Sequence, residues 1–142
     1  MKQKFIELYM DWAARTAKLS HAKRLQVGAV IVKDDSVISY GYNGMPAGWD
    51  NNCENIVGYN VGEPMLKTKP EVLHAESNAI AKLAKSHNSG LGADLFITHS
   101  PCLDCAKLIV QSGIRRVWYN ENYRDDEGVR FLILSGIEVK QI

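Results

Sequence analysis

Residues 94–113 read DLFITHSPCLDCAKLIVQSG, and this stretch decides the fold of the chain. It begins with an apolar run that predicts a buried strand over residues 94–99. A helical pattern then covers residues 102–112, with Pro101 just before it and Gly113 at its end. A strand that leads into a helix and then into another strand is the unit of parallel sheets, so the stretch predicts an α/β fold.

The same alternation of strand and helix continues in both directions along the chain. The other predicted helices cover residues 3–19, 73–86 and 126–135, and the other predicted strands cover 27–32, 37–40, 115–119 and 137–140. The first helix is expected to be amphipathic, with one apolar stripe made of Phe5, Leu8, Trp12, Thr16 and Leu19. Turn residues at 33–36 join the first two strands into a hairpin. This order predicts a mostly parallel sheet with helices on both faces.

Between Gly41 and Lys69 the pattern breaks up into Gly, Pro, Asn and scattered aromatic residues. We expect a long irregular segment there, and long loops in compact domains are usually functional.

Length and composition limit the class of protein. The chain of 142 residues is expected to form one domain over 1–142, and its 46% hydrophobic and 23% charged residues are ordinary for a soluble protein. A formal net charge of +1 provides no basic field and argues against a polynucleotide substrate. No stretch predicts a signal peptide or a membrane span, and three cysteines without a secretion signal indicate a cytoplasmic location.

The chemistry is concentrated in His74-Ala75-Glu76 and Pro101-Cys102-Leu103-Asp104-Cys105. One imidazole and two thiolates are three of the four ligands of a tetrahedral Zn²⁺, and an open fourth position for water is typical of catalytic sites. This spacing matches the signature of zinc nucleobase deaminases, in which the glutamate moves protons and is not a ligand. We therefore expect His74, Cys102 and Cys105 to bind one catalytic Zn²⁺, with Glu76 as the catalytic acid and base.

The spacing also constrains where these side chains lie. Cys102 and Cys105 share one face in the first turn of a helix, whose N-terminus stabilises thiolates. Residues two apart do not share a helix face, so His74 and Glu76 must lie where their helix begins. Two helix N-termini are expected to converge on the metal.

Other interpretations remain open for these residues. The cysteine pair could be accidental, or a structural zinc could use Cys53 as a fourth ligand, although such a site has no use for Glu76. A non-catalytic zinc-binding interaction module is a further alternative.

The chain resembles the zinc-dependent cytidine deaminase superfamily and, within it, the deoxycytidylate (dCMP) deaminases. The resemblance extends over nearly the whole chain and is carried by residues 26–32, 41–46, 74–80, 101–109 and 111–114, with Tyr119, Tyr123 and Arg124. Gly41-Tyr42-Asn43-Gly44, Asn78 and the long segment before His74 favour the dCMP branch, because tRNA adenosine deaminases keep that segment short. A tRNA adenosine deaminase or a free-base deaminase is the second choice.

The resemblance implies a three-layer α-β-α fold around a five-stranded mixed sheet. The implied strand order is 2-1-3-4-5, in which only the first strand runs against the others. The implied reaction is hydrolysis of dCMP to dUMP and ammonia, which supplies dUMP for thymidylate synthesis.

The resemblance also implies substrate contacts. Asn43 would contact the sugar and phosphate, while Val27 and the backbone amide of Ala75 would border the base. Tyr123 would close over the nucleotide and Arg124 would lie near the phosphate. The alternatives are an ordinary half-exposed ring for Tyr123 and a solvated loop cation for Arg124.

Regulation is implied as well. dCMP deaminases are typically homohexamers that dCTP activates together with Mg²⁺ and that dTTP inhibits, and the loop of Tyr42, Asn43 and Gly44 would lie between the catalytic and effector sites. Trp49, Met65 and Leu66 could form subunit contacts or simply pack the loop. Many relatives bind a second, structural zinc in the 44–73 segment, where this chain has only Cys53, with His21 and His87 as distant candidates.

Overall fold

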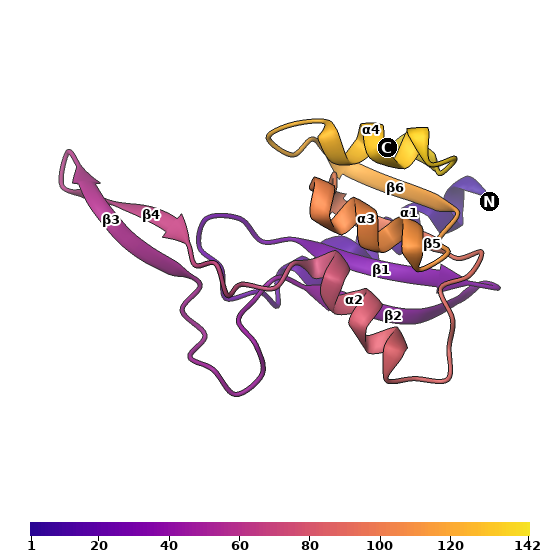
Figure 1. The fold of residues 1–142 in the computed structure, drawn as a ribbon, viewed down its shortest axis with the longest axis horizontal. Helices are drawn as coiled ribbons and strands as arrows, with labels where there is room; N and C mark the ends of the chain where they lie inside the picture. The colour runs from indigo at the N-terminus through magenta and orange to yellow at the C-terminus, as the bar shows by residue number, and fades with distance from the viewer.

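A five-stranded mixed sheet forms the centre of the molecule, and a separate two-stranded hairpin projects from it (Figure 1). The computed structural model describes all residues from Met1 to Ile142. In chain order the elements are α1 (Gln3–Ala17), β1 (Gly28–Lys33), β2 (Ser36–Tyr42), β3 (Glu54–Asn60), β4 (Glu63–Thr68), α2 (Ala75–Ala84), β5 (Asp94–His99), α3 (Leu103–Gln111), β6 (Arg116–Glu121), α4 (Glu127–Leu134) and β7 (Glu138–Gln141). All the helices and strands predicted outside residues 41–69 are present.

The central sheet has the order β2-β1-β5-β6-β7. Strand β1 pairs antiparallel with both β2 and β5, whereas β5, β6 and β7 are parallel. When the five strands of this sheet alone are counted in chain order, the arrangement is 2-1-3-4-5 with only β1 reversed. The predicted α/β fold class is therefore confirmed.

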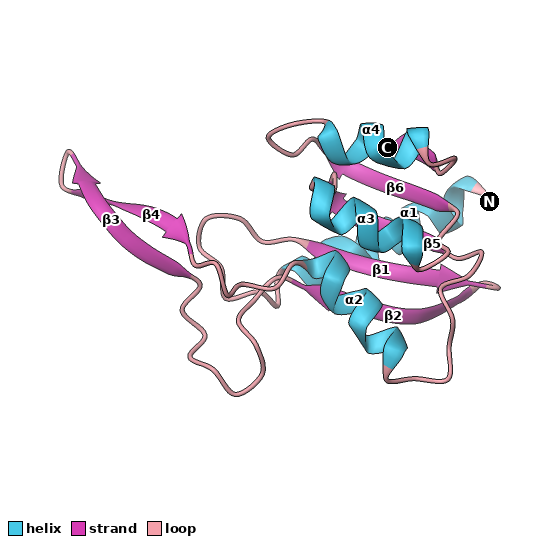
Figure 2. Ribbon diagram, viewed as in Figure 1, coloured by secondary structure: helices cyan, strands magenta, loops and turns pink.

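Each face of the sheet buries its own apolar cluster, because successive strand residues point to opposite faces. On one face, Val30, Phe96 and Trp118 pack against α1. On the other face, Ile31, Leu95 and Val117 lie in one cluster with side chains of α2, α3 and α4. Helices on both faces give three layers (Figure 2).

The first helix packs through a stripe that overlaps the predicted one only in part. Thr16 is buried and Phe5 packs against the core as predicted, but Leu8, Trp12 and Leu19 are exposed, and the other buried residues are Ile6, Tyr9, Met10, Ala13 and Ala17. At Gly28 the strand approaches α1 closely, because a Cβ there would lie 2.1 Å from the carbonyl oxygen of Ala13. The small residues Ala13 and Ala17 face the sheet at that point.

Residues 54–68 form an antiparallel hairpin of β3 and β4, so the prediction of a wholly irregular 41–69 segment was wrong. A two-residue turn joins the strands, with positive φ angles of 51° at Val61 and 79° at Gly62. A register shift between Ile56 and Gly58 interrupts the alternation of side chains. That bulge and Pro64 hide the strand pattern in the sequence.

No helix of the protein is both long and apolar enough to cross a membrane.

Candidate active site

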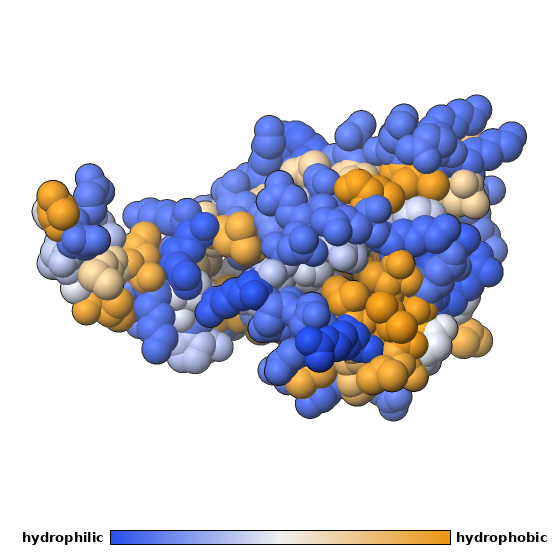
Figure 3. Space-filling view, turned by 90° about the horizontal axis from the view of Figure 1, so that it is seen from above, coloured by the Kyte–Doolittle hydropathy of each residue, from blue (hydrophilic) through white to orange (hydrophobic).

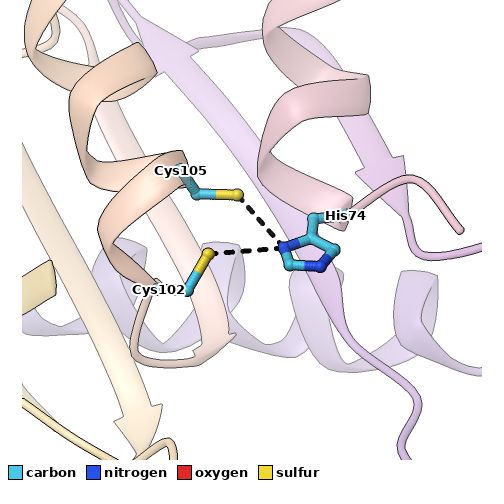
Figure 4. Close-up of side chains that lie close together, drawn as sticks. All are labelled: His74, Cys102 and Cys105. Atoms are coloured by element: carbon cyan, nitrogen blue, oxygen red, sulfur yellow. Dashed lines mark hydrogen bonds between the residues drawn. The ribbon is translucent and has the colours of Figure 1, made fainter. Parts of the chain in front are cut away.

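Three potential metal ligands meet between the starts of α2 and α3 (Figure 4). His74 is the N-cap of α2, Cys102 is the N-cap of α3, and Cys105 follows in the first turn of α3. Nδ1 of His74 lies 3.5 Å from Sγ of Cys102 and 3.3 Å from Sγ of Cys105. A tetrahedral zinc with its usual bond lengths would separate such ligands by about 3.6 Å. This metal-ligand triad therefore fits Zn²⁺, and two helix N-termini converge on it as predicted.

The electrostatics of the two thiols also suit a cation. Hydrogen bonds with Cys105 and His74 lower the pKa of Cys102 to about 4. The hydrogen bond to Cys102, together with burial, raises the pKa of Cys105. A divalent cation bound at these residues would supply the positive charge that makes both sulfur atoms thiolates.

Glu76 is 4% exposed and lies in the first turn of α2 beside the metal-ligand triad. Burial raises the pKa of its carboxyl to about 7. A carboxyl with such a pKa can both accept and donate a proton near neutral pH, and a cation on the triad would lower the value. Position and chemistry therefore agree with an acid and base role.

Close packing holds the triad in place. A Cβ on Gly41 of β2 would lie 2.4 Å from the carbonyl oxygen of Ala75, so β2 contacts the start of α2 directly. A Cβ on Gly128 would lie 2.0 Å from the carbonyl oxygen of Pro101, so the start of α4 rests on the loop before α3. Both helix starts are therefore fixed by backbone contact.

A pocket of about 480 Å³ opens beside the triad. Its lining includes all the predicted substrate-contacting residues, namely Val27, Asn43, Ala75, Tyr123 and Arg124, together with Glu76, His74 and Cys102. Cys105 lies behind the pocket, where it is buried. A concave site with a few converging polar groups is typical of small-molecule binding.

Asn43 holds one wall of this pocket together. Its Oδ1 accepts a hydrogen bond from the backbone N–H of Val27 at 2.9 Å, and its Nδ2 donates to the carbonyl oxygen of Leu25 at 2.8 Å. One N–H and one lone pair of the amide remain available for a ligand. The side chain thus has a structural role and keeps free groups with which it could make the predicted substrate contact.

Tyr123 and Arg124 lie on the loop between β6 and α4. The backbone N–H of Tyr123 donates to Oγ of Ser100 at 2.7 Å, and the guanidinium of Arg124 lies 5.4 Å from the Tyr123 ring centroid. The arginine is therefore drawn toward the ring on its own loop and forms no ion pair.

Tyr42 and Gly44, predicted to lie near an effector, do not line the pocket. Their backbones are nevertheless connected to α2. The Tyr42 carbonyl oxygen accepts from Nδ2 of Asn78 at 2.9 Å, and Gly44 pairs with Leu73 through hydrogen bonds of 3.0 and 2.8 Å. Leu73 directly precedes His74, so this loop, which contains Asn43, also lies next to the triad.

Sequence reasoning missed several residues of the pocket. His99 lines the pocket with Glu121, and its Nε2 lies 3.5 Å from Oε2 of Glu121. Arg24 and Thr68 line it as well. The one available signal was position, because His99 and Glu121 end parallel strands and such strand ends gather at one edge of a sheet.

Cys53 does not join the metal-ligand triad, nor do His21 and His87 form any second group of three potential ligands. Cys53 is fully buried, and burial raises the pKa of its thiol. Of the tryptophans, Trp118 is buried and stacked on Phe96, whereas Trp12 and Trp49 are exposed.

Comparison with known sequences agrees with a zinc-binding site at the triad. The family described as "Cytidine and deoxycytidylate deaminase zinc-binding region" matches residues 3–121. The ComE operon protein 2 of Bacillus subtilis is 34% identical over 96% of this chain and 70% of its own length. The human deoxycytidylate deaminase is 37% identical over 85% of this chain and 67% of its own length. The yeast deoxycytidylate deaminase is 35% identical, and the match spans only 46% of that longer protein.

Comparison with solved structures points the same way. The dCMP deaminase of cyanophage S-TIM5, solved in complex with dCMP and dUMP, superposes with a TM-score of 0.89 and 42% identity. The match covers 100% of this chain and 99% of the cyanophage chain. A tRNA:A34 deaminase structure, with 24% identity and a TM-score of 0.63, shares the fold alone.

Proposed function

This chain belongs to the cytidine and deoxycytidylate deaminase family, and from that premise we propose that it hydrolyses dCMP to dUMP and ammonia. The observation that supports dCMP as the substrate is the match along the full chain to the cyanophage enzyme, which was solved in complex with dCMP and dUMP. The product would supply thymidylate synthesis. The proposal treats residues 1–142 as one catalytic domain that works in the cytoplasm.

The metal-ligand triad would hold one Zn²⁺, which when bound supplies Lewis-acid activation of a water molecule. Glu76 accepts a proton as the water oxygen attacks C4 of the cytosine ring, and delivers that proton to N3. Glu76 then takes the proton of the new C4 hydroxyl group and passes it to the amino group, so the C–N bond breaks, ammonia leaves and the C4 oxygen becomes the carbonyl of uracil. Atoms balance, since water and dCMP give dUMP and ammonia, and Glu76 returns to its starting state. Its burial keeps bulk water from competing for these transfers.

The remaining pocket residues would orient the nucleotide. Val27 and the backbone N–H of Ala75 border the base beside Glu76, and Asn43 faces the sugar and phosphate. Tyr123 closes the open side of the pocket. Positive charge for the phosphate comes from arginine, because the lining contains Arg24 and Arg124 and no lysine.

Two alternative functions make different predictions. A tRNA adenosine deaminase shares the fold, but a net charge of +1 offers little to attract a polynucleotide. A non-catalytic zinc module has no need for a buried Glu76 in the pocket.

Ammonia release should be measured side by side with dCMP, dCTP, deoxycytidine, cytosine and a tRNA. A preference for dCMP supports the proposal, and equal rates on deoxycytidine and dCMP would reject the substrate.

We also propose a homohexamer that dCTP with Mg²⁺ activates and that dTTP inhibits. Support for assembly comes from the hairpin, on which Ile56, Val57, Tyr59, Val61 and Met65 are exposed (Figure 3). A two-stranded hairpin is marginally stable alone in water, and a second copy of the chain would cover this surface. Trp49 is exposed and Leu66 is partly buried nearby in the sequence.

Support for regulation comes from the loop of Tyr42, Asn43 and Gly44. It contributes Asn43 to the pocket and pairs through Gly44 with Leu73, next to His74. An effector that shifts this loop would alter both substrate binding and the triad. Sigmoidal dCMP kinetics that become hyperbolic with dCTP, together with inhibition by dTTP, are expected. Hyperbolic kinetics in a monomer that ignores both triphosphates would reject this part of the proposal alone.

A further inference from the structure

One hydroxyl group joins the two loops that lead to the substrate pocket from β5 and β6. Ser100, the first residue after β5, is 4% exposed and lines the pocket. Its Oγ accepts a hydrogen bond from the backbone N–H of Tyr123 at 2.7 Å. Tyr123 belongs to the loop of residues 122–126, between β6 and α4, and lines the same pocket. Neither metal binding nor proton transfer uses this hydroxyl group.

The backbone of Ser100 is itself held on both sides. Its N–H donates to the carbonyl oxygen of Glu121, the last residue of β6, at 2.9 Å. The next residue, Pro101, is packed against the start of α4, because a Cβ on Gly128 would clash with the carbonyl oxygen of Pro101. The hydroxyl group therefore extends from a fixed piece of backbone that continues into Cys102.

The loop of residues 122–126 has few other attachments. Among the backbone groups of residues 122–125, only the N–H of Tyr123 forms a hydrogen bond with the rest of the fold. The side-chain bonds of the loop are local, since Oδ1 of Asp125 accepts from the N–H of Glu127 at 3.1 Å and Nη2 of Arg124 donates to Oη of Tyr123 at 3.4 Å. One hydrogen bond thus connects the middle of the loop with the segment after β5.

The loop also has open space on a second side. Ser100, Asn122, Tyr123 and Arg124 line both the substrate pocket and another hollow of about 370 Å³, which extends to Val129 of α4. Packing behind the loop is therefore incomplete. Segments with few buried contacts are the first parts of a protein to open. The bond to Ser100 is then what decides where the Tyr123 ring lies.

We propose that Ser100 is a positioning residue, whose hydroxyl group holds the backbone of Tyr123 so that the ring closes the substrate pocket before the nucleotide binds. A ring that is already in place loses less conformational entropy on binding than a ring on a free loop. The contribution of Ser100 therefore appears in the affinity for the nucleotide and not in the chemical step. This deepens the proposed function and rests on it.

The test uses the zinc-loaded full chain with dCMP as the substrate. Ser100→Ala is expected to raise the KM about three- to tenfold, as the loss of one hydrogen bond does, while kcat and the zinc content change little. Ser100→Thr keeps a hydroxyl group and should restore most of the affinity. Ser112→Ala is the matched control, because Oγ of Ser112 also makes a 2.7 Å hydrogen bond, to the carbonyl oxygen of Ile109, but does not line the pocket.

A double-mutant cycle tests whether Ser100 acts through Tyr123. Tyr123→Ala alone should raise the KM at least as much as Ser100→Ala does. In the Tyr123→Ala background, Ser100→Ala should add less than about twofold, since both substitutions remove one contact. General damage to the fold would instead lower kcat and would add to the effect of Tyr123→Ala.

Amide exchange measures the position of the loop directly, without substrate. The N–H of Tyr123 should exchange about three- to tenfold faster in Ser100→Ala than in the wild type, because its acceptor is gone. The same N–H should exchange at the wild-type rate in Ser112→Ala.

Several outcomes would overturn the inference. Loss of zinc from Ser100→Ala, or a fall in kcat without a rise in KM, would show that Ser100 acts on the triad. Full additivity with Tyr123→Ala, or unchanged exchange at Tyr123, would also reject it. If Ser100→Thr does not fold because of its extra methyl group, Ser100→Ala and the cycle still decide. A wild-type chain that does not deaminate dCMP would reject the proposed function itself, whereas an active wild type with an unaffected Ser100→Ala would reject only this inference.

Discussion

The metal-ligand triad and the β3–β4 hairpin are built in opposite ways. The triad lies where two helices begin, against the packed sheet, and backbone contacts at Gly41 and Gly128 fix its position. The hairpin projects from the body, and the side chain at its tip, Val61, is 97% exposed (Figure 1). The proposed chemistry thus lies in the closely packed part of the molecule, while the hairpin exposes apolar side chains.

The comparison also shows how the two regions meet. The pocket wall between them forms hydrogen bonds with Glu54 of the hairpin and with Asn43, which directly follows β2. Substitutions in the rigid region should therefore stop the reaction, and substitutions in the hairpin should change binding or assembly.

The largest expected effect is that of a substitution at Glu76, which should stop turnover without removing the metal. Glu76→Gln should retain one zinc per chain, because this side chain is not a ligand, and should lower kcat by about 10² to 10⁴. Metal analysis and ammonia release on the same sample measure both quantities. Loss of zinc from this variant, or turnover near that of the wild type, would contradict the role given to Glu76.

The next effect lies on the wall between the two regions. Asn43→Ala should lower kcat/KM for dCMP more than tenfold, on the order of 1.4 kcal/mol or more, because it removes a substrate contact and frees Val27 and Leu25. Steady-state kinetics measure the change. Asn51→Ala, in the exposed loop before β3, is the matched control and should be close to wild type.

A smaller effect on turnover, but a clear one on assembly, is expected from the hairpin surface. Replacing Ile56 and Tyr59 together by lysine should place charge in a subunit contact and dissociate the oligomer toward the chain mass of 15.9 kDa. Light scattering after size exclusion measures the mass. Leu134→Lys is the control, because Leu134 is apolar and even more exposed but belongs to α4. An unchanged oligomer in the double variant would exclude this surface as the interface.

The smallest effect concerns the turn of the hairpin. Val61 is β-branched and has a φ angle of 51°, a conformation that Asn adopts more easily. Val61→Asn should stabilise the hairpin by about 1 kcal/mol and slow amide exchange in β3 and β4 by up to about fivefold. Val57→Asn, at the bulge, should give no such gain. Faster exchange in Val61→Asn would show that the turn is not strained.

The features that could be predicted from the sequence lie mainly in the triad and the central sheet, and the hairpin could not be predicted. His74, Glu76, Cys102 and Cys105 were predictable as a group because their chemistry depends on short spacings at helix starts, which the sequence displays directly. The central strands were predictable because apolar runs such as residues 94–99 can only be buried.

What the sequence hid depends on contacts between distant residues. The hairpin was missed because a bulge near Val57 and a proline at position 64 break its alternation. The packing stripe of α1 was partly misjudged because it depends on contacts with other elements, such as the close approach of Gly28 to Ala13 and Ala17. Arg24 gave no signal, since only the fold brings its segment to the pocket, and the one signal for His99 was its position at the end of a parallel strand.

The two helix N-caps carry a consequence for handling the protein. His74 and Cys102 occupy cap positions without making any side-chain cap hydrogen bond, so each helix begins without the stabilisation that Ser, Thr, Asn or Asp would provide. A metal bound to these residues would join the two helix starts, and its binding energy would add to the free energy of unfolding. At a free zinc concentration 100 times the dissociation constant, the gain is about 2.7 kcal/mol. The melting temperature therefore becomes a measure of free zinc, and a chelating buffer would weaken the whole fold as well as remove the activity.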